Sequence, residues 1–171
     1  SRLIVLLIEA MVPCRDMNLR TFLRYAILTG LFAVLFVPFI VANPLFFPFI
    51  TGKNFAFRII IEIVFALWAI LALMDPSVRP KKSALLYIVL GLVAALALSD
   101  ALGENPAKSF WSNFERMEGW VTMVHLGLYF VVMSSMLTAE KLWRKLFATQ
   151  IGASVLMALY GVCQLAGVFV I

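Results

Sequence analysis

The sequence predicts an all-α protein: a multi-pass bundle of transmembrane helices with one short amphipathic helix outside the membrane. The 171 residues are 64% hydrophobic and 13% charged, with a mean hydropathy of +1.03, whereas soluble domains are close to half apolar and a quarter charged. Several apolar runs approach the roughly 20 residues that a helix needs to cross a bilayer. The basic residues stand in short clusters between these runs, which is typical of membrane topology.

The apolar runs predict five spans within one helical domain. We expect them at about 25–41, 55–74, 84–99, 120–137 and 146–171. The apolar segment at 3–12 is too short to span, so it is either an interfacial helix or a stretch before the natural start. Because the fifth span is still apolar at Ile171, we expect residues 1–171 to be the N-terminal part of a longer protein.

The basic clusters predict the orientation of the spans. Three clusters flank alternate connections: Arg15, Arg20 and Arg24; Arg79, Lys81 and Lys82; and Lys141, Arg144 and Lys145. The positive-inside rule then places the N-terminus in the cytoplasm and the polar loop at 100–119 outside. The net charge of +5 follows from this distribution, so the lipid bilayer is the expected partner and nucleic acid is not.

A polar segment at 105–119 interrupts the apolar sequence. Asn105 is a good N-cap and Pro106 suits the first helical position. Four apolar residues then recur at helical spacing: Phe110, Trp111, Phe114 and Met117. This spacing predicts a short amphipathic helix on the outer membrane surface, ended by Gly119.

Two interpretations of this segment stay open. Trp and Phe are typical of the headgroup level, so the helix is either a plain interfacial anchor or part of a site at the outer face. In the second case the polar side chains shape the site: Asn113, Glu115, Arg116 and Glu118.

Polar residues also stand within the expected fourth span. Glu118, Thr122, His125 and Tyr129 share one helical face if the helix runs through Gly119. Polar groups at this depth usually face other helices. They either form interhelical hydrogen bonds or mark a pathway or site.

The expected second span carries Arg58 and Glu62, four residues apart. An intrahelical ion pair is the simplest interpretation, although the Arg-before-Glu order is the weaker one and leaves room for a partner on another helix. Arg58 can extend outward, where Lys53 and Arg116 are also expected. Such cations hold phosphate well, and arginine can bind two oxygens at once.

Two further features bear on packing and chemistry. Small or polar residues recur along single stripes of the third and fifth spans, which predicts close helix packing: Gly91, Ala95 and Ser99; and Gln150, Ser154, Gly161 and Gln164. With one histidine and two cysteines, a zinc site is not expected. Neither a phosphate-binding glycine loop nor a nucleophile triad stands in the sequence, and no cofactor is expected.

Several motifs together resemble the N-terminal half of bacterial O-antigen ligase-like membrane proteins, over about 18–171. The most specific is the string Ser-Phe-Trp-Ser-Asn-Phe-Glu-Arg-Met-Glu-Gly at 109–119, followed by His125. The weaker matches are Phe-Pro-Phe-Ile-Thr-Gly-Lys at 47–53, Phe57-Arg58 with Glu62 and Trp68, and Tyr160-Gly161 with Gln164.

The resemblance implies an enzyme of the bacterial inner membrane. Such proteins transfer a glycan from undecaprenyl pyrophosphate to a lipid or protein acceptor, or lengthen the glycan as polymerases. The family's catalytic basic residues and histidine belong to a large external loop in the C-terminal half, so these residues alone are not expected to be active. The candidate substrate-binding residues are Lys53, Arg58, Asn113, Glu115, Arg116, Glu118 and His125. The alternatives are a transporter or flippase of lipid-linked sugars and a noncatalytic membrane scaffold.

Overall fold

The computed structural model describes residues 18–42, 47, 50–113 and 119–167, and its regular elements within these ranges are all helices. In chain order they are α2 (Leu19–Ala33), the 3₁₀ helix η1 (Val34–Phe39), α3 (Thr51–Met74), the 3₁₀ helix η2 (Pro76–Val78), α4 (Ala84–Leu102), α5 (Pro106–Trp111), α6 (Trp120–Met136) and α7 (Glu140–Leu165). The all-α prediction is confirmed.

Four helical segments of the described chain are long and apolar enough to cross a membrane. They are Leu19–Phe39 (α2 continued by η1), α3, α4 and α7. The fourth of the five expected spans, α6, has 17 residues and is the short one.

Two of the expected spans begin about six residues earlier than predicted. The first helix begins at Leu19 rather than near 25, and the last begins at Glu140 rather than near 146. The basic residues expected to lie between spans therefore belong to the first turns of these helices. Lysine and arginine are good helix formers, and the headgroup regions add about 5–8 Å of polar thickness on each side into which a helix can extend.

The core lies where α2, α3 and α6 meet. Leu23, Ile27 and Leu31 recur every four residues on α2 and are buried in one cluster with residues of α3 and α6. Trp68 of α3 joins this cluster, and its indole Nε1 donates to the carbonyl oxygen of Val78 at 3.2 Å. The i, i+4 stripe on α2 is the pattern expected of a helix that buries one face.

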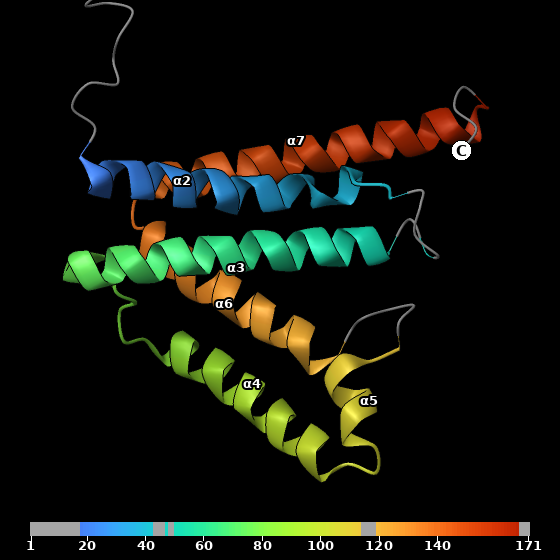
Figure 1. Ribbon diagram of the computed structural model, residues 1–171. Coiled ribbons are helices and arrows are strands. Elements are labelled where there is room, and N and C mark those ends of the chain that lie inside the picture. Colours follow the sequence, from blue (N-terminus) through green and yellow to red (C-terminus); the bar gives the residue numbers. More distant parts are fainter. Residues whose placement is uncertain (1–17, 43–46, 48–49, 114–118, 168–171) are drawn as a thin grey trace, which may run out of the picture.

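Successive long helices alternate in direction (Figure 1). The start of α2, the α3–α4 connection and the start of α7 lie at one end of the bundle, whereas the end of η1, the start of α3 and α5 lie at the other. In this view α6 passes obliquely behind α3, and α4 lies on the far side of α6 from α2. The described residues of the three basic clusters therefore share one end.

The small-residue stripes do not form the close helix contacts that we expected. A Cβ atom built on Gly91 of α4 or on Gly161 of α7 would meet no atom within 4 Å among the described residues. The α4 stripe is exposed, and the α7 stripe is exposed at Gln150 and Ser154 and half-buried at Gly161 and Gln164, so the spacing alone did not produce close packing at these glycines.

Candidate functional site

A layer of paired polar side chains joins α3 to α6. Arg58 Nη2 on α3 donates to Thr122 Oγ1 on α6 at 2.7 Å. One turn further along both helices, His125 Nε2 lies 3.1 Å from Glu62 Oε1. The pairs follow in the same order on both helices because α3 and α6 run in the same direction (Figure 1). We call these four residues the α3–α6 polar layer.

The layer lies deep within two apolar helices. Glu62 is the twelfth of the 24 residues of α3, about 16 Å from the start of the helix at 1.5 Å per residue. Arg58 and His125 are each only 8% exposed. The Glu62 side chain, in contrast, is 65% exposed, so the layer opens toward the surface of the described bundle through this carboxylate.

Further contacts hold the α6 side of the layer in place. His125 Nδ1 lies 2.7 Å from the carbonyl oxygen of Val121. Tyr129, one turn beyond His125, donates a long hydrogen bond of 3.4 Å to the carbonyl oxygen of Leu31 on α2. Its ring meets Phe57 edge to face, with ring centroids 6.4 Å apart.

The predicted polar face of the fourth span is confirmed for Thr122, His125 and Tyr129, which all point toward neighbouring helices. The proposed extension of this face to Glu118 required a helix through Gly119. Instead α6 begins at Trp120, with Gly119 as its N-cap in an extended conformation. Glu118 itself lies outside the described residues.

The Arg58–Glu62 pair differs from the simplest expectation. The charges attract each other along α3, but the hydrogen-bonding partners are on α6: Thr122 for Arg58 and His125 for Glu62. Arg58 is buried and does not extend outward. A cross-helix acceptor satisfies a guanidinium donor without exposing it, which is the physical reason for the difference.

The start of the predicted amphipathic helix is confirmed, and its length is not. The Asn105 side chain accepts from the Lys108 backbone N–H at 3.2 Å, and Pro106 occupies the first turn. However, α5 ends at Trp111, well before Met117, because Ser112 has a φ of +64°. This left-handed conformation stops an α-helix.

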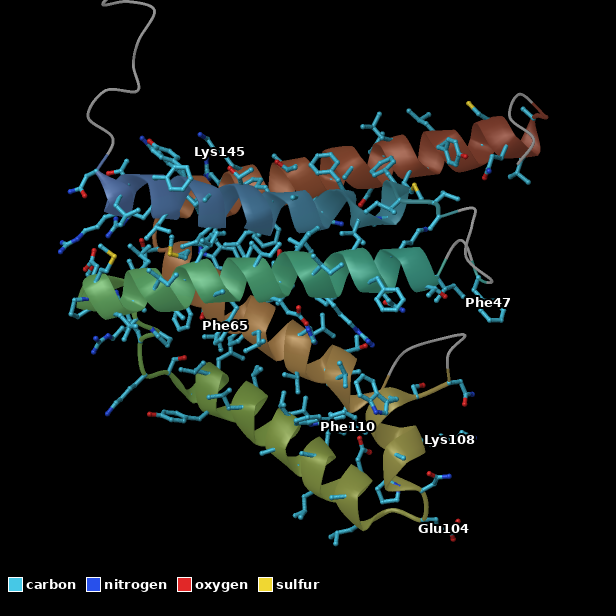
Figure 2. All side chains as sticks on the ribbon, viewed as in Figure 1. Phe47, Phe65, Glu104, Lys108, Phe110 and Lys145 are labelled. Carbon is cyan, nitrogen blue, oxygen red and sulfur yellow. The ribbon has the colours of Figure 1, made fainter. Side chains whose placement is uncertain are left out.

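A largely apolar pocket of about 450 Å³ lies between α4, α5 and α6. Its aromatic wall consists of Phe110, Trp111 and Trp120, and its opposite wall includes Ala97 and the carboxyl-bearing Asp100. Figure 2 shows Phe110 on the side of α5 that faces α4, whereas Lys108 and Glu104 point away. Trp120 is fixed by an indole hydrogen bond of 3.0 Å to the carbonyl oxygen of Val93.

The remaining candidate residues do not join the polar layer. Lys53 lies half-buried in the first turn of α3, and Asn113 is exposed just after α5. Glu115, Arg116 and Glu118 lie outside the described residues. The expected convergence of Lys53, Arg58 and Arg116 on a phosphate therefore stays a prediction, with Arg58 buried rather than at the surface.

The candidate set left out Glu62, which the structure places in direct contact with His125. The signal was present in the sequence, since two apolar helices each carry two polar residues about one turn apart: Arg58 and Glu62 on one, Thr122 and His125 on the other.

A second pocket, which is polar and has a volume of about 150 Å³, also escaped prediction. It lies near the other end of α3 and α6 and is lined by Ser77, Arg79, Lys81, Ser134, Ser135 and Thr138.

Across the described ranges, no group of three or more His, Cys, Asp or Glu side chains is arranged to hold a metal ion. The layer instead offers a buried cation and an acid–base pair between two helices.

Comparisons of the chain with protein-family models, with curated proteins and with solved structures found no match.

Proposed function

We propose that this chain is the membrane-embedded part of an O-antigen ligase or polymerase. In this role the chain is part of a glycosyltransferase that takes a glycan from undecaprenyl pyrophosphate. The enzyme passes the glycan to a lipid or protein acceptor, or lengthens the glycan as a polymerase. The reaction class comes from the motif resemblance at 109–119. The structural observation that supports a functional site is the α3–α6 polar layer.

The polar layer favours a site because simple helix packing does not require it. A charged side chain within a span is costly, so such residues usually mark a substrate or ion pathway. Here Arg58 pairs with Thr122, and Glu62 pairs with His125 about one helical turn further along. Arginine suits a ligand whose headgroup carries phosphate charge, although Arg58 itself is buried in the described chain.

The pocket beside α5 supports the lipid part of the proposal. Its walls are mostly apolar and aromatic, and it lies at the same end of the bundle as the start of α3. An apolar wall suits a polyprenyl chain, and tryptophan is typical of the membrane–water boundary.

We further propose a location in the bacterial cytoplasmic membrane, with the N-terminus in the cytoplasm and the 100–119 loop outside. The described residues of the three basic clusters gather at one end of the bundle, which supports this orientation because cytoplasmic ends carry the excess of lysine and arginine.

A transfer assay with purified undecaprenyl pyrophosphate-linked glycan tests the function in the full-length protein. Arg116→Lys keeps the charge but loses the planar donor fork, so we expect reduced transfer at normal protein level. Trp111→Ala, which removes a 60% exposed aromatic, should instead lower stability or membrane insertion. Normal transfer by Arg116→Ala at normal expression would remove the 105–119 segment from the site and leave the interfacial anchor.

One observation favours the alternative of a transporter or flippase for lipid-linked sugars. The 65% exposed Glu62 side chain at mid-helix depth is the kind of intramembrane carboxylate that lines a pathway. Translocation of lipid-linked glycan across proteoliposomes that contain no acceptor would support the flippase. Transfer that depends on acceptor, without translocation, would support the ligase. The absence of both activities would support a noncatalytic scaffold.

A further inference from the structure

His125 is the single histidine of the sequence, and both of its ring nitrogens have close oxygen neighbours. Nδ1 lies 2.7 Å from the carbonyl oxygen of Val121, and Nε2 lies 3.1 Å from Glu62 Oε1. A backbone carbonyl oxygen can only accept a hydrogen bond. The short contact to Val121 therefore requires that Nδ1 carries a hydrogen.

This assignment determines what lies between His125 and Glu62. In a neutral imidazole with hydrogen on Nδ1, Nε2 is an acceptor, and an ionised carboxylate is an acceptor as well. Two acceptors at 3.1 Å repel each other unless a proton lies between them. We propose that His125 and Glu62 form a proton-binding site that holds one shared proton between α3 and α6.

The proton can belong to either partner. The pair is imidazolium with carboxylate, or neutral imidazole with carboxylic acid, and the two forms have the same total charge. When the pair loses its proton to water, an anionic Glu62 faces the lone pair of Nε2, and the interhelical hydrogen bond is lost.

Few other titratable groups face the pair in the described chain. Arg58 lies one turn outward on α3, and its charge attracts Glu62. Tyr129 lies one turn beyond His125 on α6 and is bonded to α2. The titratable residues of the neighbouring helices stand near the helix ends: Arg20, Arg24 and Tyr25 on α2, and Tyr87 and Asp100 on α4.

The consequence is a contact between α3 and α6 that depends on pH. Loss of the shared proton breaks the hydrogen bond between Nε2 and Oε1, so the proposed site stabilises the contact only while the proton is held and the contact weakens when it is released. This inference concerns the helix contact and does not depend on the proposed glycan transfer.

Nitrogen NMR of the protein labelled only in histidine tests the assignment directly, because the spectrum reports one residue. We expect an imidazolium, or a neutral ring protonated on Nδ1, in the wild-type protein at about neutral pH. A neutral ring protonated on Nε2, with bare Nδ1, would overturn the proposal, because Nδ1 could then not donate to Val121. This readout needs no variant to fold.

A matched pair of variants tests the pH dependence. The amide of Glu62→Gln can donate to Nε2 without a shared proton, so this variant should stay folded but lose the pH dependence of the contact. Glu104→Gln removes an exposed carboxylate elsewhere and is the control.

Between about pH 6 and about pH 9, a range that covers proton release by free histidine, we expect the unfolding temperature in detergent to fall by about 3 °C or more for wild type and Glu104→Gln. The unfolding temperature of Glu62→Gln should fall by less than half as much over the same pH range. Equal losses for Glu62→Gln and wild type would refute a stabilising shared proton.

Discussion

Arg58 carries a full charge into the bundle and remains almost completely buried. Its guanidinium meets a hydroxyl from another helix, so at least one of its donors is satisfied by a neutral acceptor rather than by a carboxylate. Thr122 thus supplies one acceptor to this buried charge. Removing an acceptor from a buried charged donor costs more than the bond contributes on average, because the charge stays desolvated.

Thr122→Val should therefore destabilise the protein by about 1–3 kcal/mol. Valine has nearly the same shape as threonine but offers no acceptor to Arg58. Thermal unfolding in detergent measures the effect, and Thr122→Ser, which keeps the hydroxyl, is the matched control. Equal unfolding temperatures for the valine and serine variants would contradict a stabilising role for the hydrogen bond.

Asp75 provides a second residue-scale prediction, at the cytoplasmic end in the proposed orientation. Hydrogen bonds from Ser77, through its side chain and its backbone N–H, together with Arg24 at 2.7 Å lower the pKa of Asp75 from 3.8 to about 2. A lowered folded-state pKa gives stability that is present above the unfolded value and lost as pH falls through the folded value.

We expect wild-type protein to lose stability as pH falls from about 4 toward 2, over the range set by these pKa values. Asp75→Asn should show a smaller loss over the same range, measured by thermal unfolding at each pH. The exposed Glu104 is the control site, because Glu104→Gln should retain the wild-type acid sensitivity. An unchanged acid response of Asp75→Asn would contradict the prediction.

At the scale of elements, the junction between α5 and α6 depends on a glycine. A Cβ on Gly119 would lie 2.7 Å from the backbone nitrogen of Ser112 and closer still to the carbonyl oxygen of Phe110. These are backbone atoms at the end of α5, which cannot rotate away as a side chain can. Gly119 thus permits the chain to pass close to the end of α5. It thereby determines how α5, which lines the apolar pocket, meets α6.

Gly119→Ala should destabilise the protein by about 1–3 kcal/mol, as overpacking typically does. Gly161→Ala is the matched control on α7, where a Cβ would meet no atom within 4 Å. In a helix interior this change should be neutral or stabilise by up to about 1 kcal/mol. If both variants unfold at the same temperature in detergent, the close approach at Gly119 has no energetic consequence.

At the scale of the molecule, the alternation of helices brings like ends together. The starts of α2 and α7 and the α3–α4 connection share one end, and α5 lies at the other (Figure 1). Since basic residues concentrate at the first end, the positive-inside rule gives one favoured orientation for the whole bundle.

Cysteine labelling in intact cells tests that orientation. In a background with Cys14→Ser and Cys163→Ser, Glu104→Cys should react with an impermeant maleimide and Ser77→Cys should not. Both positions are exposed in the described chain, so access is limited by the membrane and not by packing. After cell lysis both should react, which controls for reactivity. The reverse pattern in intact cells would invert the proposed topology.

The sequence predicted most of the fold because hydrophobic run length is a local property. The helices at 51–74, 84–102 and 120–136 lie close to the predicted spans. The first and last helices begin earlier than predicted, because hydropathy marks the apolar part of a helix and not its charged end. The length of α5 was also overestimated, since helical spacing continued past a residue whose backbone stops the helix.

The sequence by itself determined the helical class, the polar face at Thr122, His125 and Tyr129, and the helix start at Asn105, because each depends on residues near one another in the chain. Only the tertiary structure decided which polar residues pair. Arg58 and Glu62 are neighbours on one helix, yet each forms its hydrogen bond with α6. A polar group buried between helices takes the acceptor or donor with the best geometry, and that geometry is set by how α3 and α6 pack.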